Sequence, residues 1–449
     1  MFDIEPISLY ELSKLVNGVA IGIDCLLNAV YLNSKEIPRG NSCFISIKGE
    51  NFDADDFVGE AEMLGARAII TSKKIESKIP YIIVDDTRKA LCTIAKRNIK
   101  NTKIIGITGS VGKTTTKNMI TSVLKQKYAV CGTKENENNE IGVAKTLLNI
   151  KNHEFCVVEM GMRALSEIEF LSSVASPETA VLTNIGTAHI ERLGSKENIF
   201  KAKMEILNSK PRSFVSPYYL EYEGFDFGKT RTYFVGKDTV CNAKIINTNR
   251  EFTEFVIVDA EYISKIMKIY SLNLANIQNA LLTYKVGKLY GLTDDEIGRG
   301  IQNFKLDKMR EEHKFLGNLE IINDAYNASL ESVISAIETS VNYGKMTGKK
   351  VNLLLGDLLE IEGYEEEIYS EISSCCKKNN IDKIYLFGER IKILNTLLNN
   401  KATLSNSAEE LSRIIIKEIN GEKDLLLVKA SRKVQIERVI REMRDKYNE

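Results

Sequence analysis

The chain has 449 residues, of which 43% are hydrophobic, and its 61 Lys and Arg residues balance 61 Asp and Glu residues. This length exceeds what one ordinary hydrophobic core organises, so two or three domains are expected. The balanced charge gives no net field toward nucleic acid or anionic lipid, and no apolar run approaches the roughly 18 residues that span a bilayer. We therefore expect a globular protein with no nucleic-acid partner and no membrane insertion.

Cysteine and histidine usage narrows the chemistry further. The eight cysteines form no C-x-x-C pair, and Cys375 and Cys376 are adjacent, which suits neither a zinc knuckle nor a disulfide framework. We interpret them as reduced thiols of a cytoplasmic protein, and the N-terminus lacks the basic-then-apolar pattern of a secretory signal. Because the whole chain has three histidines, a multi-histidine metal site is not expected.

Three α/β blocks follow one another along the chain. Residues 1–100 alternate β-branched runs such as "CFISIKG" and "PYIIVDD" with helical stretches, which predicts a small α/β domain. Residues 101–313 repeat an apolar strand, a polar strand end and a helix, which is typical of a mainly parallel sheet, with a more β-rich insert near 230–270. Residues 314–449 show the same rhythm in "LEIINDAY", "KVNLLLGD" and "DLLLVKAS". The predicted fold class is α/β with three domains.

The stretch "GITGSVGKTTTKNMI", residues 106–120, carries the clearest chemical signal. An apolar strand runs into a two-glycine turn, and a helix with an apolar face is expected over 114–127. Backbone N–H groups at such a turn can bind phosphate, Lys113 can reach the β- and γ-phosphates, and Thr114 can coordinate Mg²⁺. The spacing departs from G-x-x-x-x-G-K-[ST], which would need a glycine at Ile107. A turn that only connects strand to helix is the alternative, but Gly-Lys-Thr at this junction favours a nucleotide site.

Two later strands end in residues that could join this site. "FCVVEMG" runs into Glu159, and "TAVLTNIGTAHIE" continues through Asn184 to His189. Ligands of open parallel sheets bind beyond the carboxyl ends of the strands, so Glu159 is a candidate Mg²⁺ ligand. Taken alone, the carboxylate could cap the sheet and the histidine could be solvated. Their placement after strands, together with the phosphate loop, favours one shared site.

Lys203 lies on the apolar stripe of the helical segment "ENIFKAKMEIL", four residues after Ile199. It could be a lysine whose stem covers apolar surface while its charge reaches water. Alternatively, it is turned into the site, where burial would lower its pKa and favour reaction with CO₂. The resulting carbamate would be an anionic metal ligand.

A family resemblance extends over several segments in chain order. The chain resembles the Mur ligases in "GITGSVGKTTT", "ENENNEIGVAKTLLN", "VVEMGM", "TNIGTAHIERLGSKENIFKAKMEIL", "INDAYNASLES", "LLLGDLLEI" and "VKASRKVQIERV". That family's phosphate loop has the spacing T-G-x-x-G-K-T-T, which accounts for Ile107. The resemblance is strong over about residues 100–449 and weaker over 1–100. It implies a central P-loop parallel-sheet ATPase domain (101–313) between an N-terminal UDP-sugar-substrate domain (1–100) and a Rossmann-like C-terminal domain (314–449) on the amino-acid or dipeptide side.

The resemblance also implies a set of site residues. ATP would be bound by Gly109, Ser110, Gly112, Lys113, Thr114, Thr115, Asn276, Asn279, Arg310, Asp324, Tyr326 and Asn327. Two Mg²⁺ ions would be bound by Thr114, Glu159, His189 and a carbamylated Lys203. The catalytic residues would be Lys113, His189 and Lys203. The substrates would contact Ser34, Asn138, Asn139, Lys429, Ser431 and Arg432.

The implied activity is ATP-dependent, ADP-forming peptide ligation in cell-wall precursor synthesis. A nucleotide-linked peptide carboxylate would attack the γ-phosphate, and an amine would then displace phosphate from the acyl phosphate. The motif "DAYNA" resembles the members that add D-alanyl-D-alanine to UDP-N-acetylmuramoyl-tripeptide, and the D-N-P-R stretch of diaminopimelate-adding members is absent. The partners would be the nucleotide-peptide and an amino acid or dipeptide, and we expect a monomer whose C-terminal domain closes over the central one.

Departures from the family pattern keep alternatives open. In the N-terminal domain, Asn33-Ser34-Lys35 stands where D-S-R is usual, and "FDADDF" (52–57) stands where F-D-G-H-D-F is usual. The resemblance implies that Asn276 and Asn279 flank the adenine, and Ala275 stands where a histidine usually precedes the first of them. An alanine also follows Lys429 where glycine is common. One alternative is therefore an archaeal pseudomurein-type peptide ligase that adds a different amino acid, and another is a folylpolyglutamate-synthase-like enzyme.

A protein of another class is also possible. A P-loop nucleotide-binding regulator would keep the phosphate loop without making a bond. Such a switch has no evident need for Glu159, His189 and Lys203, so the ligase interpretation is favoured.

Overall fold

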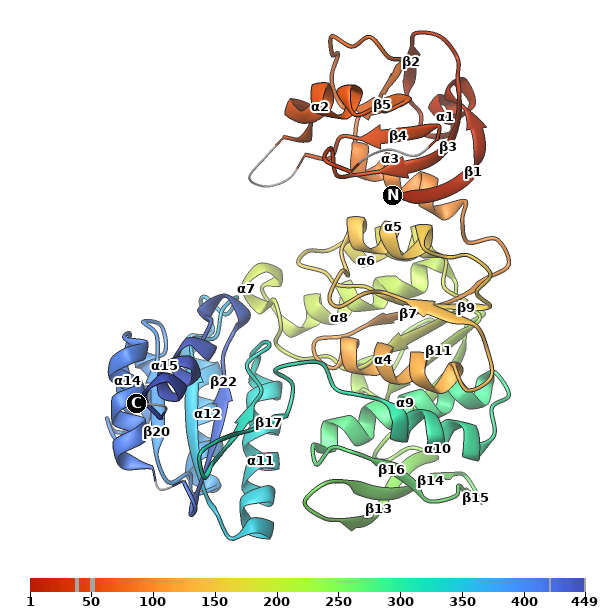
Figure 1. The fold of residues 1–449 in the computed structure, drawn as a ribbon. Helices are drawn as coiled ribbons and strands as arrows, with labels where there is room; N and C mark the ends of the chain where they lie inside the picture. The colour runs from red at the N-terminus through yellow and green to blue at the C-terminus, as the bar shows by residue number, and fades with distance from the viewer. Residues whose placement is uncertain (37–39, 49–52, 420, 448–449) are drawn as a thin grey trace.

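The computed structural model describes residues 1–36, 40–48, 53–419 and 421–447, in three α/β units that follow chain order (Figure 1). Phe52, the first residue of "FDADDF", lies outside the described residues. Within the described part of the chain, no helix has the length and apolarity needed to cross a membrane. The eight cysteines are all unpaired thiols.

The N-terminal unit is a mixed sheet with the strand order β1-β3-β4-β5-β6-β2. Its four inner strands run parallel, and β1 and β2 pair antiparallel at the two edges. Strands β4 and β5 are buried along their whole length because both faces of the sheet are covered. The elements are β1 (Phe2–Ser8), α1 (Leu9–Leu15), β2 (Val19–Ile21), β3 (Leu26–Tyr31), β4 (Ser42–Ile45), η1 (Ala54–Phe57), α2 (Val58–Met63), β5 (Ala68–Thr71), β6 (Tyr81–Ile83) and α3 (Thr87–Lys96).

The central unit contains a six-stranded parallel sheet with the order β12-β11-β10-β7-β9-β8, which confirms the expected parallel architecture. Strands β10, β7 and β9 are neighbours, so the phosphate loop and the two polar strand ends meet at one edge. Helix α4 begins at Lys113 and ends at Leu124, close to the expected 114–127. The elements are β7 (Lys103–Thr108), α4 (Lys113–Leu124), β8 (Val130–Gly132), α5 (Glu140–Leu148), β9 (Phe155–Glu159), α6 (Glu167–Ala175), β10 (Thr179–Leu182), α7 (Ile190–Leu193), α8 (Lys196–Met204), η2 (Glu205–Ser209), β11 (Ser213–Pro217), η3 (Leu220–Tyr222) and β12 (Arg231–Val235).

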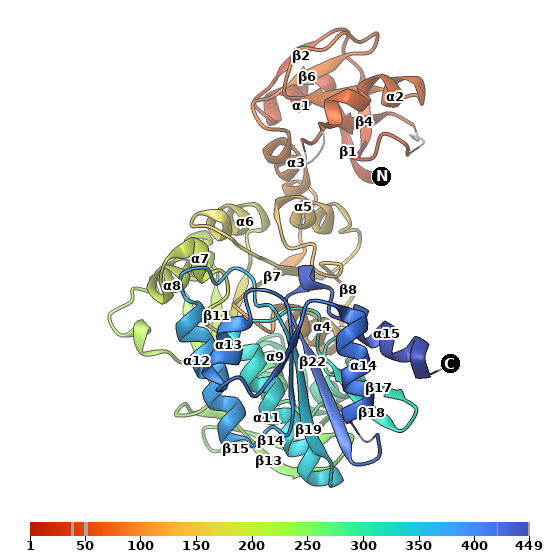
Figure 2. The ribbon, with the colours of Figure 1, turned by 90° about the vertical axis from the view of Figure 1, so that its left-hand side faces the viewer.

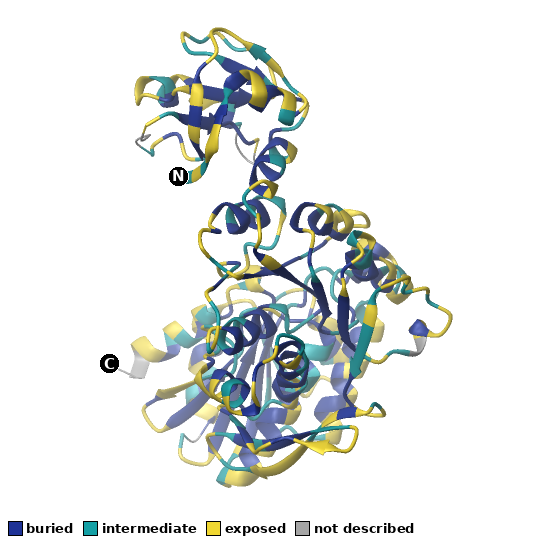
Figure 3. Cartoon of the chain, turned by 90° about the vertical axis from the view of Figure 1, so that its right-hand side faces the viewer, coloured by how far each residue is buried: buried dark blue, intermediate teal, exposed yellow. Residues whose placement is uncertain are grey.

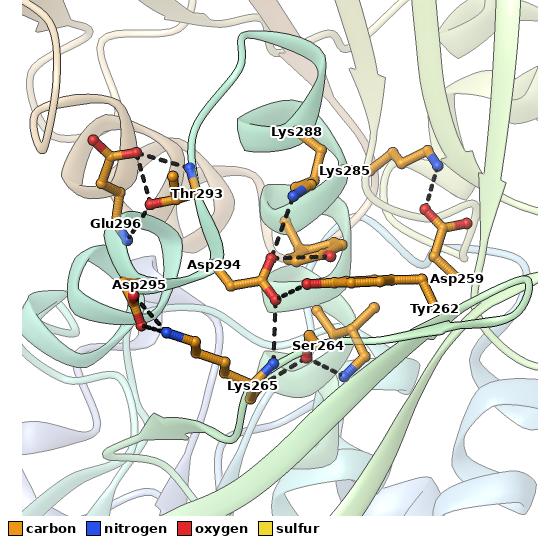
Figure 4. A network of polar contacts seen from close by, with 12 residues as sticks. Asp259, Tyr262, Ser264, Lys265, Lys285, Lys288, Thr293, Asp294, Asp295 and Glu296 are labelled. Atoms are coloured by element: carbon orange, nitrogen blue, oxygen red, sulfur yellow. Dashed lines mark hydrogen bonds and ion pairs between the residues drawn. The ribbon is translucent and has the colours of Figure 1, made fainter.

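The β-rich insert forms an antiparallel sheet beside two helices of the central unit. The Asp294 carboxylate ties the sheet to the helices: it accepts hydrogen bonds from Tyr262 Oη at 2.7 Å, Lys265 N at 3.1 Å and Lys288 Nζ at 3.3 Å (Figure 4). The elements are β13 (Cys241–Thr248), β14 (Thr253–Asp259), β15 (Tyr262–Ile263), β16 (Met267–Ile269), α9 (Leu274–Leu289) and α10 (Asp294–Asn303).

The C-terminal unit has the strand order β17-β18-β22-β19-β20-β21, parallel except for the antiparallel edge strand β17. The expected boundary after residue 313 falls inside β17, which begins at Glu312. The elements are β17 (Glu312–Leu316), β18 (Leu319–Asn323), α11 (Leu330–Thr347), β19 (Lys350–Gly356), α12 (Glu365–Lys378), β20 (Ile384–Phe387), α13 (Lys392–Leu397), β21 (Thr403–Ser405), α14 (Ala408–Glu418), β22 (Asp424–Lys429), η4 (Arg432–Val434) and α15 (Glu437–Tyr447).

The three units differ in how closely they pack. The N-terminal unit stands apart at one end and reaches the central unit through α3, which packs on α5 (Figure 2). The C-terminal unit lies beside the central unit, and α7 reaches toward it (Figure 1). Buried residues lie in the sheets of each unit and also on α3 and α5, where the N-terminal unit meets the central one (Figure 3).

Candidate active site

A cavity of about 1250 Å³ opens between the central and C-terminal units. Its wall includes the loops that follow β7, β8, β9 and β10, the starts of α5 and α9, the linker between α10 and β17, and the loops that follow β18, β19 and β22. Both parallel sheets thus present the carboxyl ends of their strands to the same space, which is where open α/β sheets bind ligands.

Most of the predicted site residues lie on this wall. The central unit contributes Ser110, Gly112, Lys113, Thr114, Thr115, Asn138, Asn139, Glu159, His189, Asn276 and Asn279. The linker and the C-terminal unit contribute Arg310, Asp324, Tyr326, Asn327, Lys429, Ser431 and Arg432. Residues predicted to contact nucleotide, metal and substrate therefore share one cavity.

Three predicted residues are not on the wall. Gly109 packs against the end of β10, so closely that a Cβ there would lie 1.9 Å from Thr183 Oγ1. Lys203 is 1% exposed on α8. Ser34 lies in the N-terminal unit, where its hydroxyl donates to Glu60 Oε2 at 2.5 Å. The structure thus does not bring Ser34 to the cavity between the other two units.

The phosphate loop is held in shape by its neighbours. Gly112 has a φ of 80°, a left-handed conformation that favours glycine, and directly precedes α4. Val111 N donates to Asn184 Oδ1 at 2.8 Å, and Gly186 N donates to Ser110 Oγ at 2.9 Å. These bonds fix the loop against the end of β10. The N–H groups of Ser110 and Val111 donate to Asn184, so the N–H groups at the N-terminus of α4 form the preorganised anion site.

Lys113 is the cation of this loop. Its Nζ donates to Gly109 O at 2.6 Å and to Ser110 O at 3.2 Å. Burial lowers the pKa of Lys113, while Glu159 opposes that shift and Arg310 adds to it. A phosphate would offer the ammonium stronger, charge-assisted partners than these carbonyls.

Glu159 presents one oxygen to the protein and leaves the other without a partner. Its Oε1 accepts from Asn138 Nδ2 at 2.8 Å, whereas Oε2 is buried with no hydrogen-bond partner. An unpaired buried carboxylate oxygen is costly, so this atom fits a cation ligand. No group of three or more His, Cys, Asp or Glu side chains forms a metal cluster among the described residues. Thr114 and Glu159 would thus need phosphate oxygens to complete a Mg²⁺ shell, as is usual at nucleotide sites.

His189 directly precedes α7, and Lys203 lies on α8, the next helix in the chain. His189 Nδ1 is 2.5 Å from Glu360 Oε2 of the C-terminal unit, a contact that lowers the pKa of Glu360. Burial lowers the pKa of Lys203 well below its usual value, Lys113 adds to this shift, and Glu331 opposes it. The Lys203 amine is therefore electrostatically coupled to the phosphate-loop lysine.

Two cationic side chains, Arg310 and Lys429, lie on the C-terminal side of the cavity and have different partners. The Arg310 guanidinium stacks over the Tyr326 ring at 4.1 Å from its centroid, and its Nη2 is 3.5 Å from Thr114 Oγ1. Lys429 Nζ donates to Asp324 Oδ2 at 2.5 Å and to Asn327 O at 3.0 Å. Arg310 thus reaches toward the phosphate loop, whereas the Lys429 ammonium is occupied in holding the loop after β18.

Comparisons with known proteins identify the family. A family model described as the Mur ligase middle domain matches residues 107–287. A curated relative from Bacillus subtilis (strain 168), named UDP-N-acetylmuramoyl-tripeptide–D-alanyl-D-alanine ligase, is 35% identical over 432 residues, which cover 93% of each chain. The chain belongs to the Mur ligase family.

Solved structures share the Mur ligase fold over nearly the whole chain. Crystal structure I of MurF from Acinetobacter baumannii superposes with a TM-score of 0.90 at 24% identity and covers 99% of this chain and 100% of the other. MurF from Thermotoga maritima in complex with ADP has a TM-score of 0.83 at 27% identity, over 94% and 98% of the two chains. The expected three-domain architecture is thereby confirmed.

Sequence reasoning missed several residues of this Mur ligase site. Glu331, at the start of α11, accepts from Thr187 N at 2.7 Å and joins the two units. Arg88 on α3 lines the cavity and donates to Glu140 Oε1 at 3.1 Å, which brings the N-terminal unit to its edge. Glu360 lies in "LLLGDLLEI", a segment that carried the family resemblance, so a signal for it existed.

Proposed function

We propose that this Mur ligase joins D-alanyl-D-alanine to the terminal carboxylate of UDP-N-acetylmuramoyl-tripeptide and converts ATP to ADP and phosphate. The observation that carries the proposal is the curated relative of that name, because its 35% identity extends over 93% of both chains. The match therefore includes most of the N-terminal unit, where two of the departures from the family pattern lie. A ligase for D-Ala-D-Ala is accordingly favoured over the pseudomurein-type, folylpolyglutamate-type and regulator alternatives.

The reaction requires stabilisation of negative charge rather than a nucleophilic side chain. A carboxylate oxygen of the tripeptide attacks the γ-phosphorus of ATP, ADP leaves, and an acyl phosphate forms. The amine of the dipeptide then attacks the carbonyl carbon, loses a proton, and phosphate leaves. Lys113, the N–H groups of the phosphate loop and Arg310 surround the place where phosphoryl oxygens would gain charge. These are preorganised cations and donors of the kind such a transition state needs.

We infer that the site would bind two Mg²⁺ ions. The partnerless Oε2 of Glu159 and the Thr114 hydroxyl would bind one ion. His189 would bind the other together with Lys203, which is buried and lies off the cavity wall. Bound Mg²⁺ neutralises and orients phosphate and carboxylate oxygens. Asn138 keeps Glu159 in place through the 2.8 Å bond to its Oε1, so one Glu159 oxygen stays available.

Lys203 would bind its ion as a carbamate. The neutral amine adds to CO₂ to form a carbamate anion and releases one proton. Burial lowers the pKa of Lys203, so the neutral amine is available at a pH where an exposed lysine is protonated. A carbamate would place a negative charge beside Lys113 in place of a second cation, which removes the repulsion between the two lysines.

The substrate side is formed by two groups of residues. Asn138 and Asn139 line the side where we place the peptide carboxylate, and Ser431 and Arg432 line the side of the incoming amine. Ser431 Oγ accepts from Leu359 N at 2.9 Å, which fixes it to the loop after β19. We infer that the protein acts as a monomer in the cytoplasm, where ATP and nucleotide-linked precursors are available.

The test is phosphate release from ATP and Mg²⁺ with UDP-N-acetylmuramoyl-tripeptide, with D-Ala-D-Ala, with single amino acids or with no amine. We expect release only when both the tripeptide and D-Ala-D-Ala are present. Release with another nucleotide-linked peptide and a single amino acid, but not with this pair, would move the assignment to the pseudomurein-type reaction. Phosphate release at the same rate with and without any amine would contradict the ligase function.

A further inference from the structure

A hydrogen-bonded chain of side chains lines one end of the cavity, beyond the phosphate loop. Asn279 Nδ2 donates to Asn276 Oδ1 at 3.2 Å. Asn276 Nδ2 donates to Ser271 Oγ at 2.8 Å and to Glu311 Oε2 at 3.3 Å. Ser271 Oγ in turn donates to Glu311 Oε2 at 2.5 Å. A Cβ on Gly112 would lie 2.9 Å from Asn279 Oδ1, so this chain starts directly against the phosphate loop.

The direction of every bond in this chain is set by one carboxylate. Glu311 Oε1 accepts from Leu272 N at 2.8 Å, and a backbone N–H can only donate. Glu311 Oε2 accepts from both Ser271 and Asn276. Burial raises the pKa of Glu311, while the hydrogen bonds from Ser271 and Leu272 N oppose that shift. In its ionised form the carboxylate has no hydrogen to give, so the nitrogen of the Asn276 amide must face it. The Asn276 oxygen must then point the other way.

This orientation decides what Asn276 can offer a ligand. Both hydrogens of its Nδ2 are used, by Ser271 and Glu311. Its Oδ1 accepts one hydrogen bond, from Asn279, and an amide oxygen has two lone pairs. Asn276 lines the cavity, so the group that it has left for a bound base is an acceptor.

We propose that Glu311 makes the nucleotide site selective for a 6-amino purine over a 6-oxo purine, because it fixes Asn276 with its oxygen toward the base. The inference rests on the proposed function and on the family resemblance, which implies that Asn276 and Asn279 flank the adenine of ATP. A 6-amino group donates a hydrogen bond to the Asn276 oxygen. A 6-oxo group would place a second acceptor against that oxygen, and no hydrogen bond would form. The 6-oxo purine would bind more weakly, because it leaves buried polar groups of the site without hydrogen-bond partners. Glu311 is a positioning residue, since it acts through Asn276.

The variant Glu311→Gln tests this inference with a change of polarity at constant shape. The oxygen of the new amide must face Leu272 N–H, so its nitrogen faces Asn276. The Asn276 amide then rotates and presents its nitrogen to the base. We expect the ratio of the dissociation constants of GDP and ADP, measured by calorimetry with Mg²⁺ on the full chain, to fall on the order of tenfold. The loss for ADP should be larger than that for GDP.

Two further variants separate this effect from a general weakening of the linker. Glu312→Gln changes the neighbouring carboxylate, which accepts from Met309 N at 3.1 Å and Asn323 Nδ2 at 3.2 Å. It should leave the GDP to ADP ratio unchanged. In the double variant Glu311→Gln, Asn276→Asp, the new Gln amide nitrogen can donate to the new Asp carboxylate. The other carboxylate oxygen is then an acceptor that faces the base. It should recover most of the preference for ADP.

The wild-type chain supplies a test that does not depend on the folding of a variant. IDP has a 6-oxo group, and N6,N6-dimethyl-ADP has no hydrogen on its 6-nitrogen. Both should bind at least about tenfold more weakly than ADP. Equal binding of ADP and IDP by the wild type, or an equal loss of ADP and GDP affinity in Glu311→Gln, would overturn the proposal. Failure of the ligase function would appear instead as phosphate release that ignores the amine, while these binding ratios stay as predicted.

Discussion

At the scale of single residues, Lys117 shows how a buried side chain outside the cavity shapes the site. Its Nζ donates to Thr133 O at 2.8 Å and to Glu135 O at 2.9 Å, and burial lowers its pKa. These bonds hold the segment that leads to Asn138, which in turn positions Glu159. The lysine thus supports a candidate metal ligand through two intermediate contacts.

The variant Lys117→Met should therefore weaken both the fold and the site. It removes the donor of the buried Thr133 carbonyl and of the more exposed Glu135 carbonyl, at a cost of about 1–3 kcal/mol in the free energy of unfolding. The KM for the acyl acceptor should rise more than the KM for ATP, because the affected segment lines the acceptor side. Denaturant unfolding and steady-state kinetics check this, with the exposed Lys125→Met as the control. Equal stability of the two variants would refute the role of Lys117.

Removal of the Lys203 amine tests the carbamate. Lys203→Ala should lower kcat on the order of 100-fold, because a ligand of the second ion is lost. Small carboxylic acids should restore part of that activity, since they can occupy the space of the carbamate. For the wild type, activity after removal and return of CO₂ should recover faster as pH rises, because deprotonation leaves more neutral amine. The lowered pKa of Lys203 should bring this rise to a lower pH than for an exposed lysine. If the wild type has the same activity with and without CO₂ at every pH, Lys203 does not act as a carbamate.

Residue identities were predictable where local chemistry is distinctive. Gly112, Lys113 and Thr114 follow from a glycine turn between a strand and a helix, and Glu159 follows from its place at a strand end. Glu311 was not predictable, because it lies in an irregular linker and its partners are some 40 positions earlier in the sequence, at Ser271 and Leu272. A long-range contact of this kind leaves no local pattern.

At the scale of elements, periodicity predicted the parallel sheets well because strands buried on both faces read as continuous apolar runs. It did not reveal how the antiparallel insert attaches to the helices. That attachment depends on polar contacts around Asp294, the first residue of α10. Its carboxylate accepts from Tyr262, Lys265 and Lys288, which come from different elements (Figure 4).

The variant Asp294→Asn should destabilise this attachment in a pH-dependent way. Burial raises the pKa of Asp294, but the hydrogen bonds from Tyr262, Lys265 and Lys288 outweigh it and the pKa is lowered. A lowered pKa stabilises the fold above the pKa of the unfolded state, and this contribution is lost as pH falls through the folded value. At neutral pH the variant should lose about 1–3 kcal/mol of unfolding free energy. The difference from wild type should shrink below about pH 4, and a difference that grows on acidification would contradict the account.

At the scale of the whole molecule, contacts between the central and C-terminal units enclose the cavity. Glu331 accepts from Thr187 N at 2.7 Å and Thr187 Oγ1 at 3.2 Å. Tyr364 Oη donates to Gly194 O, and His189 contacts Glu360. The C-terminal unit supplies Tyr326, which stacks with Arg310, and the residues that line the side of the incoming amine. The site is therefore complete only when the central and C-terminal units are in contact. We expect the C-terminal unit to close over the nucleotide during the reaction.

The variant Glu331→Ala should shift the molecule toward open forms. Loss of the carboxylate leaves the buried Thr187 N–H unpaired and weakens the closed form by about 1–3 kcal/mol. We expect kcat/KM to fall on the order of tenfold and the radius of gyration with ADP and Mg²⁺ to increase in small-angle scattering. Glu338→Ala, an exposed position on the same helix, is the matched control. If Glu331→Ala with ADP and Mg²⁺ has the same radius of gyration as the wild type, the contact between Glu331 and Thr187 does not hold the two units closed.

One measurement tests the central claim, that a peptide carboxylate is activated by transfer of the γ-phosphate. The terminal carboxylate of the tripeptide substrate is labelled with ¹⁸O, and the phosphate released during reaction with D-Ala-D-Ala is analysed by mass spectrometry. The account predicts one ¹⁸O atom in each phosphate, because the attacking carboxylate oxygen leaves with it when the amine displaces the acyl phosphate. Phosphate that carries no ¹⁸O would mean that water attacks ATP, and it would contradict the ligase mechanism.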